Sequence, residues 1–235
     1  MTFVVWWISC PALRVMAVDR PALEAIHTRL LSAYGPQGWW PGESRFEIIA
    51  GALLVQRTTW LNAARALDRL RGAGVLSSAA LAVSTEAAVA ELVRPAGFYR
   101  QKAARLVTLS RWLEAEGGCD ALATHGTDRL RAIWLAQPGV GPETADAILL
   151  YAYGHPVFVV DAYTRRLFAR LGLIRGDEAY ERLRGAVEGT LAADAACYNE
   201  YHALIVAHAK AHCGVRPRCV GCTLAAHCAE ARRAR

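Results

Sequence analysis

The feature of this sequence that restricts its fold most is a group of four cysteines near the C-terminal end. Cys213, Cys219, Cys222 and Cys228 lie within sixteen residues and follow the pattern C-x5-C-x2-C-x5-C. The chain has seven cysteines, and an odd number argues against a framework of disulfides. Four thiols this close together, in a chain without a recognisable secretory signal, are typical of a metal site in a reducing compartment.

The spacing favours iron over zinc. Four cysteine thiolates are the common ligands of a [4Fe-4S] cluster. A zinc site more often has two C-x2-C pairs, and only one such pair is present here. The sequence therefore predicts a [4Fe-4S] cofactor held by the four cysteines, with zinc and unliganded thiols as the alternatives.

The rest of the sequence predicts an all-α fold with short connections. Apolar residues recur at three- and four-residue spacing, and glycine and proline end the segments. The apolar content of 54% excludes a disordered chain, and no uncharged apolar run reaches the roughly 18 to 20 residues of a membrane span. The expected helices cover 19–34, a segment after Ser44, segments ending at Gly72 and before Pro95, 98–116, a segment from Thr127, 177–192 and 195–212.

The net charge of +6 comes almost entirely from arginine, because Lys102 and Lys210 are the only lysines. Arginine binds phosphate with a planar, forked donor group, which suits a polyanionic partner. Genome composition explains the bias equally well.

A turn between two expected helices offers a phosphate site. Pro138, Gly139, Val140 and Gly141 precede Pro142, the expected first residue of the second helix. Backbone N–H groups at a helix start bind anions without reading base sequence, and glycines let another backbone come close. An ordinary turn between helices is the alternative for this motif taken alone.

The turn belongs to an ordered set of motifs: LLVQRTTW, GFYRQKA, LAQPGVGPETADAILLYA and VFVVDAYTRR, followed by the cysteines. From about residue 20 to residue 228 the chain resembles the helix-hairpin-helix (HhH-GPD) DNA glycosylases, the endonuclease III superfamily. The resemblance implies two helical domains that flank a DNA groove: a six-helix domain over 45–155 and an Fe–S cluster domain over 156–235, which residues 19–44 join. Residues 1–18 are expected to be an extension, and a true start at Met16 explains them at least as well.

By the same resemblance Asp161 is the catalytic carboxylate, which stabilises positive charge on the sugar or positions water. Without the resemblance, Asp161 would be interpreted only as the N-cap of the helix that follows it. Members that also cut the backbone carry a Schiff-base lysine where this chain has Glu143. The run PETADAILLYA is also similar to the 3-methyladenine branch of the family, where glutamate stands at this position and could contact a cationic alkylated purine.

The resemblance also assigns DNA contacts. Gln56 is the plug that fills the gap left by a flipped base, and Phe98 or Tyr99 is the wedge beside it. Arg216 and Arg218, inside a cysteine loop one residue shorter than the family pattern, are expected to touch phosphate. Without the resemblance, Phe98 and Tyr99 would be interpreted as core residues at a helix start. Arg216 and Arg218 would be interpreted as charges that offset the cysteine thiolates. Trp39, Trp40 and Trp60 are expected to fill the domain junction rather than line the groove.

The sequence therefore predicts a monofunctional DNA N-glycosylase of base excision repair. It would bind double-stranded DNA with damaged bases, as a cytoplasmic monomer of the bacterial nucleoid with no membrane contact. The alternatives are a bifunctional endonuclease III acting on oxidised pyrimidines and a non-catalytic Fe–S protein that binds DNA.

Overall fold

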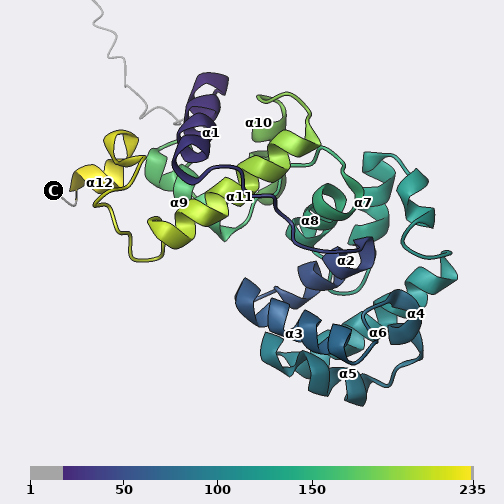
Figure 1. Ribbon diagram of the computed structural model, residues 1–235. Coiled ribbons are helices and arrows are strands. Elements are labelled where there is room, and N and C mark those ends of the chain that lie inside the picture. The colour runs from purple at the N-terminus through teal and green to yellow at the C-terminus, as the bar shows by residue number, and fades with distance from the viewer. Residues whose placement is uncertain (1–17, 234–235) are drawn as a thin grey trace, which may run out of the picture.

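The computed structural model describes residues 18–233, and this part of the chain is helical without a strand. The expected all-α fold is thus confirmed, and the arrangement is shown in Figure 1. The elements are α1 (Arg20–Tyr34), α2 (Arg45–Leu54), α3 (Trp60–Gly72), α4 (Ser78–Val83), α5 (Glu86–Val93), η1 (Arg94–Ala96), α6 (Tyr99–Ala115), η2 (Ala121–Thr124), α7 (Thr127–Leu135), α8 (Pro142–Tyr153), α9 (Ala162–Leu171), α10 (Tyr180–Glu188), α11 (Ala195–Ala211), η3 (Ala225–His227) and α12 (Ala229–Arg233).

Two hydrophobic clusters organise the described residues. The first joins α2 to α8 around buried side chains such as Leu54 and Trp134. The second joins α1 to α9, α10 and α11 around Phe158 and Tyr198. Figure 1 shows these two groups of helices as two lobes, with α8 between them. Helix α8 contributes to both clusters, so it fixes one lobe against the other.

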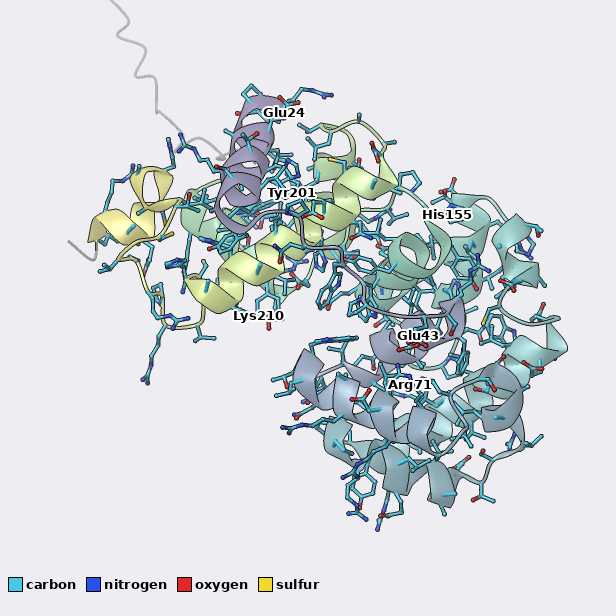
Figure 2. The ribbon with its side chains drawn as sticks, viewed as in Figure 1. Glu24, Glu43, Arg71, His155, Tyr201 and Lys210 are labelled. Atoms are coloured by element: carbon cyan, nitrogen blue, oxygen red, sulfur yellow. The ribbon has the colours of Figure 1, made fainter. Side chains whose placement is uncertain are left out.

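The first helix packs among the last ones, far away in sequence. The Tyr201 hydroxyl on α11 donates a hydrogen bond to the Leu23 carbonyl on α1 at 2.9 Å, and the sticks of Figure 2 show Tyr201 beside α1. The limits of the two domains, 45–155 and 156–235, stay a prediction, and the extension at 1–18 lies outside the described residues except for Val18.

Local hydrogen bonds explain where the helices differ from expectation. One helix expected before Pro95 is two, because Thr85 caps α5 by accepting the Ala88 N–H at 3.3 Å. The helix expected over 177–192 begins only at Tyr180, since the Glu178 carboxylate accepts the N–H groups of Arg175 and Gly176, at 2.8 Å each, and holds a loop there. No helix in 18–233 is long and apolar enough to cross a membrane.

Candidate active site

A cavity of about 670 Å³ lies where the two lobes meet. Its lining comes from the segment before α2, the α2–α3 connection, α8, the start of α9, and α11. Lys210, near the C-terminal end of α11, lies on the side of that helix toward α3 (Figure 2). The cavity therefore joins residues from the two lobes, as a groove between domains would require.

Asp161 lies in this cavity and also caps a helix. Residues 157–160 belong to no helix and are buried, which fixes the position where α9 begins. The Oδ1 atom of Asp161 accepts the Thr164 N–H at 2.7 Å. Asp161 is only 8% exposed, yet it lines the cavity. The capping function and a place in the cavity thus coexist in one residue.

His202 holds the other carboxylate oxygen of Asp161. Its Nε2 atom lies 3.4 Å from Oδ2, without good hydrogen-bond geometry, and the contact is an ion pair when the imidazole is protonated. Its Nδ1 atom is hydrogen bonded to the buried Tyr151 hydroxyl. Burial by itself would raise the pKa of Asp161, but His202 and the Thr164 hydrogen bond outweigh it, so this pKa lies below its ordinary value. Asp161 is therefore a carboxylate at neutral pH.

Glu143, in the first turn of α8, lines the same cavity. Partial removal from water and the nearby Asp161 carboxylate raise its pKa, against the opposite effect of His202 and Arg165. The two carboxyl groups thus share one cavity with different proton affinities.

The hairpin before α8 is attached to the connection between α2 and α3. The side-chain amide of Gln56 donates to the Gly139 carbonyl at 3.1 Å and to the Thr144 hydroxyl at 3.0 Å. Gly139 has φ +82°, a backbone conformation that favours glycine, and a Cβ there would lie 2.5 Å from Nε of Arg105, which would have to move. Gln56 lines the cavity beside this hairpin, but its amide is already bonded.

The remaining hairpin residues differ in what they offer to DNA. Val140 is 7% exposed with its side chain in the first cluster, and its N–H donates to the Gln137 carbonyl at 3.1 Å. Gly141 is the N-cap of α8 and has open space around it. Gly139, Gly141 and the first residues of α8 are thus the exposed part of this turn, whereas Val140 is buried.

Of the two expected wedge residues, only one is free to enter DNA. Phe98 is 56% exposed. Tyr99 packs partly against the first cluster, and the Arg94 guanidinium lies 4.5 Å from its ring centroid. Neither lines the cavity itself.

Three tryptophans both fill the junction and line the cavity, whereas the sequence favoured the junction alone. Trp39, Trp40 and Trp60 meet edge to face, with ring centroids 4.8 to 5.5 Å apart. Trp40 packs against both hydrophobic clusters, and all three rings border the cavity. Sequence analysis also missed Tyr151 and His202, because no local motif marks a side chain whose partner is distant in sequence.

The two lysines have different surroundings. The Lys102 ammonium donates to the carbonyls of Leu54 and Ala96 and is buried away from the cavity. Lys210 is exposed and lines the cavity, with its Nζ 5.6 Å from the Trp39 ring centroid. Lys210 is therefore the amine within reach of a molecule in the cavity.

The four cysteines line a separate small cavity of about 20 Å³. A guanidinium N–H of Arg170 on α9 points to Sγ of Cys213 at 3.2 Å, and the Cys228 thiol points to the Arg170 carbonyl at 3.6 Å. The donor set fits a [4Fe-4S] cluster. Within 18–233, however, no group of three or more His, Cys, Asp or Glu side chains is arranged to hold a metal ion, so the cofactor stays a prediction.

Arg216 and Arg218 are exposed on the loop between the first two cysteines, and their contact with phosphate stays a prediction. The guanidinium of Arg218 donates to the Lys210 carbonyl at 2.8 Å. The backbone N–H of Arg218 donates to the His212 carbonyl, also at 2.8 Å. Gly214 and Val215 of the same loop border the large cavity. The cysteine loop thus reaches the rim of the site.

Comparisons with known proteins show the family to which the chain belongs. A family model described as "HhH-GPD superfamily base excision DNA repair protein" matches residues 50–191. The "Putative DNA repair glycosylase MJ1434" of Methanocaldococcus jannaschii is 42% identical over 206 residues, which cover 86% of this chain and 94% of that protein. Endonuclease III of Treponema pallidum is 29% identical over 221 residues, covering 91% and 97%.

Two solved structures are also similar to this chain. The 3-methyladenine DNA glycosylase (MagIII) of H. pylori, bound to 1,N6-ethenoadenine, has a TM-score of 0.70 at 32% identity and covers 82% of this chain and 98% of its own. A non-covalent endonuclease III–DNA complex has a TM-score of 0.78 at 19% identity, covering 92% and 98%, which is a likeness of fold.

Proposed function

Because the chain is a DNA repair glycosylase that belongs to the HhH-GPD superfamily of base excision DNA repair proteins, we propose that it releases an alkylated purine from duplex DNA by hydrolysis alone. The observation that carries this proposal is that Asp161 and Glu143 line the same cavity, together with three tryptophans. The similarity to a glycosylase crystallised with a modified adenine supports the substrate class.

In this proposal Asp161 is the catalytic carboxylate. As the glycosidic bond breaks, its electron pair leaves with the base and positive charge develops on the deoxyribose. A buried carboxylate kept ionised by His202 stabilises that charge without reorganising. Water then adds to the sugar carbon and releases a proton, which completes hydrolysis without a covalent enzyme intermediate.

The rest of the cavity suits a cationic base. A positively charged ring is attracted to the faces of aromatic side chains, and Trp is the strongest partner. Trp39, Trp40 and Trp60 supply such faces, and the Glu143 carboxylate supplies an opposite charge. The positive charge of an alkylated purine also makes it a good leaving group. A neutral oxidised pyrimidine would use neither the charge nor the full aromatic surface.

The amines near the cavity decide whether a lyase step is expected. Glu143 cannot form a Schiff base at the position where the lyase members carry lysine. Lys102 is engaged with two carbonyls outside the cavity. Lys210 does line the cavity, which is the specific observation in favour of the alternative, a bifunctional endonuclease III with a substitute amine. A non-catalytic Fe–S protein that binds DNA is the remaining alternative.

DNA would be held on the same side as the cavity. The N–H groups at the start of α8 and the glycine turn suit one phosphate, and Arg216 and Arg218 suit another. Cys213, Cys219, Cys222 and Cys228 would hold a [4Fe-4S] cluster, which when bound supplies a structural cross-link for this polar loop. The monomeric state and the cytoplasmic location stay predictions.

A base-release assay tests the proposal. Duplexes carrying 3-methyladenine, an oxidised pyrimidine or a deaminated base are incubated with the wild-type protein and with Asp161→Asn. We expect release of the alkylated purine by the wild type only. Release of the oxidised pyrimidine in preference would refute the substrate class, and no release from any duplex would favour the non-catalytic alternative.

Borohydride treatment tests the missing lyase step. It reduces a Schiff base to a stable enzyme–DNA adduct, so we expect no adduct from the wild type. An adduct that Lys210→Ala abolishes, while base release continues, would instead establish the bifunctional alternative with Lys210 as the amine. Lys210→Arg is the matched control, because it keeps the positive charge beside the cavity but has no primary amine to form a Schiff base.

A further inference from the structure

Two residues share an uncommon backbone conformation and touch each other. Arg57 has φ +55° and Phe98 has φ +47°, and they are the only non-glycine residues of 18–233 with positive φ. The Arg57 guanidinium carbon lies 5.0 Å from the centre of the Phe98 ring. Such conformations cost about 1 to 3 kcal/mol each and persist where the surroundings impose them, often at functional sites.

The pair lies beside the cavity, which Arg57 lines and which Phe98 reaches only through its contact with Arg57. Arg57 follows α2, is exposed and lines the cavity. Phe98 precedes α6 and exposes 56% of its surface, which is unusual for a large aromatic side chain in a chain with two hydrophobic clusters. A guanidinium over one face of an exposed ring leaves the other face of the ring free for stacking.

Lys102 connects the two segments that carry the pair. Its ammonium donates to the Leu54 carbonyl at 2.8 Å and to the Ala96 carbonyl at 2.7 Å. Leu54 is the last residue of α2 and Ala96 the last of η1, so these carbonyls lack helical partners. Arg57 and Phe98 follow those residues by three and two positions. Lys102, only 4% exposed, thus fixes the distance between the two segments.

Gln56, which the resemblance assigned as the plug, is engaged elsewhere. Its amide donates to the hairpin at Gly139 and Thr144, and its carbonyl accepts a hydrogen bond from Arg105 at 3.3 Å. Entering the base stack would break all three bonds. Arg57, the next residue, needs no such rearrangement.

We infer that Arg57 and Phe98 form a single wedge that enters the DNA base stack at the flipped nucleotide, and that Lys102 is the positioning residue that holds its two halves together. The inference rests on the proposed function in that it requires base extrusion. The ring stacks on a neighbouring base, and the guanidinium, stacked on the ring, fills the remaining space. Stacking of one base on an aromatic side chain contributes about 1 to 3 kcal/mol.

The test uses a duplex with a tetrahydrofuran abasic analogue opposite 2-aminopurine, a base whose fluorescence rises when it is unstacked. No base is released from this duplex, so a failed glycosylase assignment leaves the measurement intact. We expect the wild type to raise the fluorescence. We expect Arg57→Ala and Phe98→Ala each to remove most of that rise and to weaken binding roughly five- to hundredfold, the equivalent of about 1 to 3 kcal/mol.

The double variant decides whether the pair is one unit. We expect Arg57→Ala with Phe98→Ala to lose little more than either single variant, since each change disables the same wedge. Arg100→Ala, an exposed arginine on α6, is the matched control for lost charge and should behave as the wild type. Additive losses, or an Arg100→Ala effect as large as that of Arg57→Ala, would overturn the single wedge.

Lys102 is tested by Lys102→Met and by its conservative variant Lys102→Arg. We expect Lys102→Met to lose the fluorescence rise and Lys102→Arg, which keeps donors for the two carbonyls, to restore part of it. Circular dichroism shows whether each variant is folded. Should Lys102→Met prove unfolded, Lys102→Arg alone must still show a reduced rise. A full fluorescence rise in a folded Lys102→Met variant would overturn the assignment, as would loss of the rise in Gln56→Ala alone.

Discussion

Replacing Asp161 by asparagine separates catalysis from capping. The amide oxygen can still accept the Thr164 N–H, now 2.7 Å from Oδ1, and asparagine caps helices as well as aspartate. The loss is therefore mainly one negative charge. At an effective dielectric constant of about 20, a unit charge about 4 Å away contributes about 4 kcal/mol, which is about a thousandfold in rate.

Single-turnover base release measures this effect. We expect Asp161→Asn to lower the release rate by about a hundred- to thousandfold, in the range of lost electrostatic donors at other active sites. Binding to an abasic duplex should stay near the wild-type value, and the free energy of unfolding should fall by no more than about 1 kcal/mol. Asp161→Ala should lower the free energy of unfolding by about 1 kcal/mol more than Asp161→Asn does, because the helix cap is lost as well.

Asp19→Asn is the matched control for this experiment. Asp19 caps α1 by accepting the Ala22 N–H at 2.8 Å, and it does not line the cavity. Its asparagine variant should release bases at the wild-type rate. If Asp161→Asn lost stability and binding together with activity, the carboxylate would be chiefly a structural cap and the reasoning would be wrong.

The remaining predictions concern the second carboxyl group, the cysteines and a buried ion pair. As the pH falls through the raised pKa of Glu143, we expect KM for a cationic purine to rise in the wild type but not in Glu143→Gln, measured by base release against pH. Cys222→Ser should lower the iron content and the visible absorbance of the purified protein; zinc in place of iron in the wild type would contradict the cluster assignment. Asp146→Ala should lower the free energy of unfolding by about 3 kcal/mol, because Asp146 is 0% exposed and accepts from Arg131 at 2.6 Å. Urea unfolding measures that loss, and one below about 1 kcal/mol would show that Arg131 finds enough compensation in Glu181, which is also 2.6 Å away.

Much of the local structure was predictable because its signals act over a few residues. Ser44 caps α2, accepting the Glu47 N–H at 3.2 Å, and Gly35 ends α1. A Gly–Val–Gly turn precedes α8, as its glycines and Pro142 indicated. Each of these depends on hydrogen bonds or steric limits within one helical turn, so the residue types alone specify them.

The lengths of some helices were not predictable from the same signals. Glu178 delays the start of α10 by binding two N–H groups of its own loop, and Thr85 divides one expected helix into α4 and α5. A polar residue near an expected helix can cap, stop or simply face water. The choice depends on the competing hydrogen bonds, which the pattern of apolar residues does not show.

The sequence by itself determined the all-α class, the helix caps, the glycine turn and the family of motifs that made Asp161 and Glu143 candidates. Only the tertiary structure decided that these two groups share a cavity, that His202 helps to lower the pKa of Asp161, and that Arg57 and Phe98 touch beside that cavity. The reason is physical: a cap is a contact between neighbours in the chain. The cavity, in contrast, exists only because two separately packed clusters bring α8, α9 and α11 together.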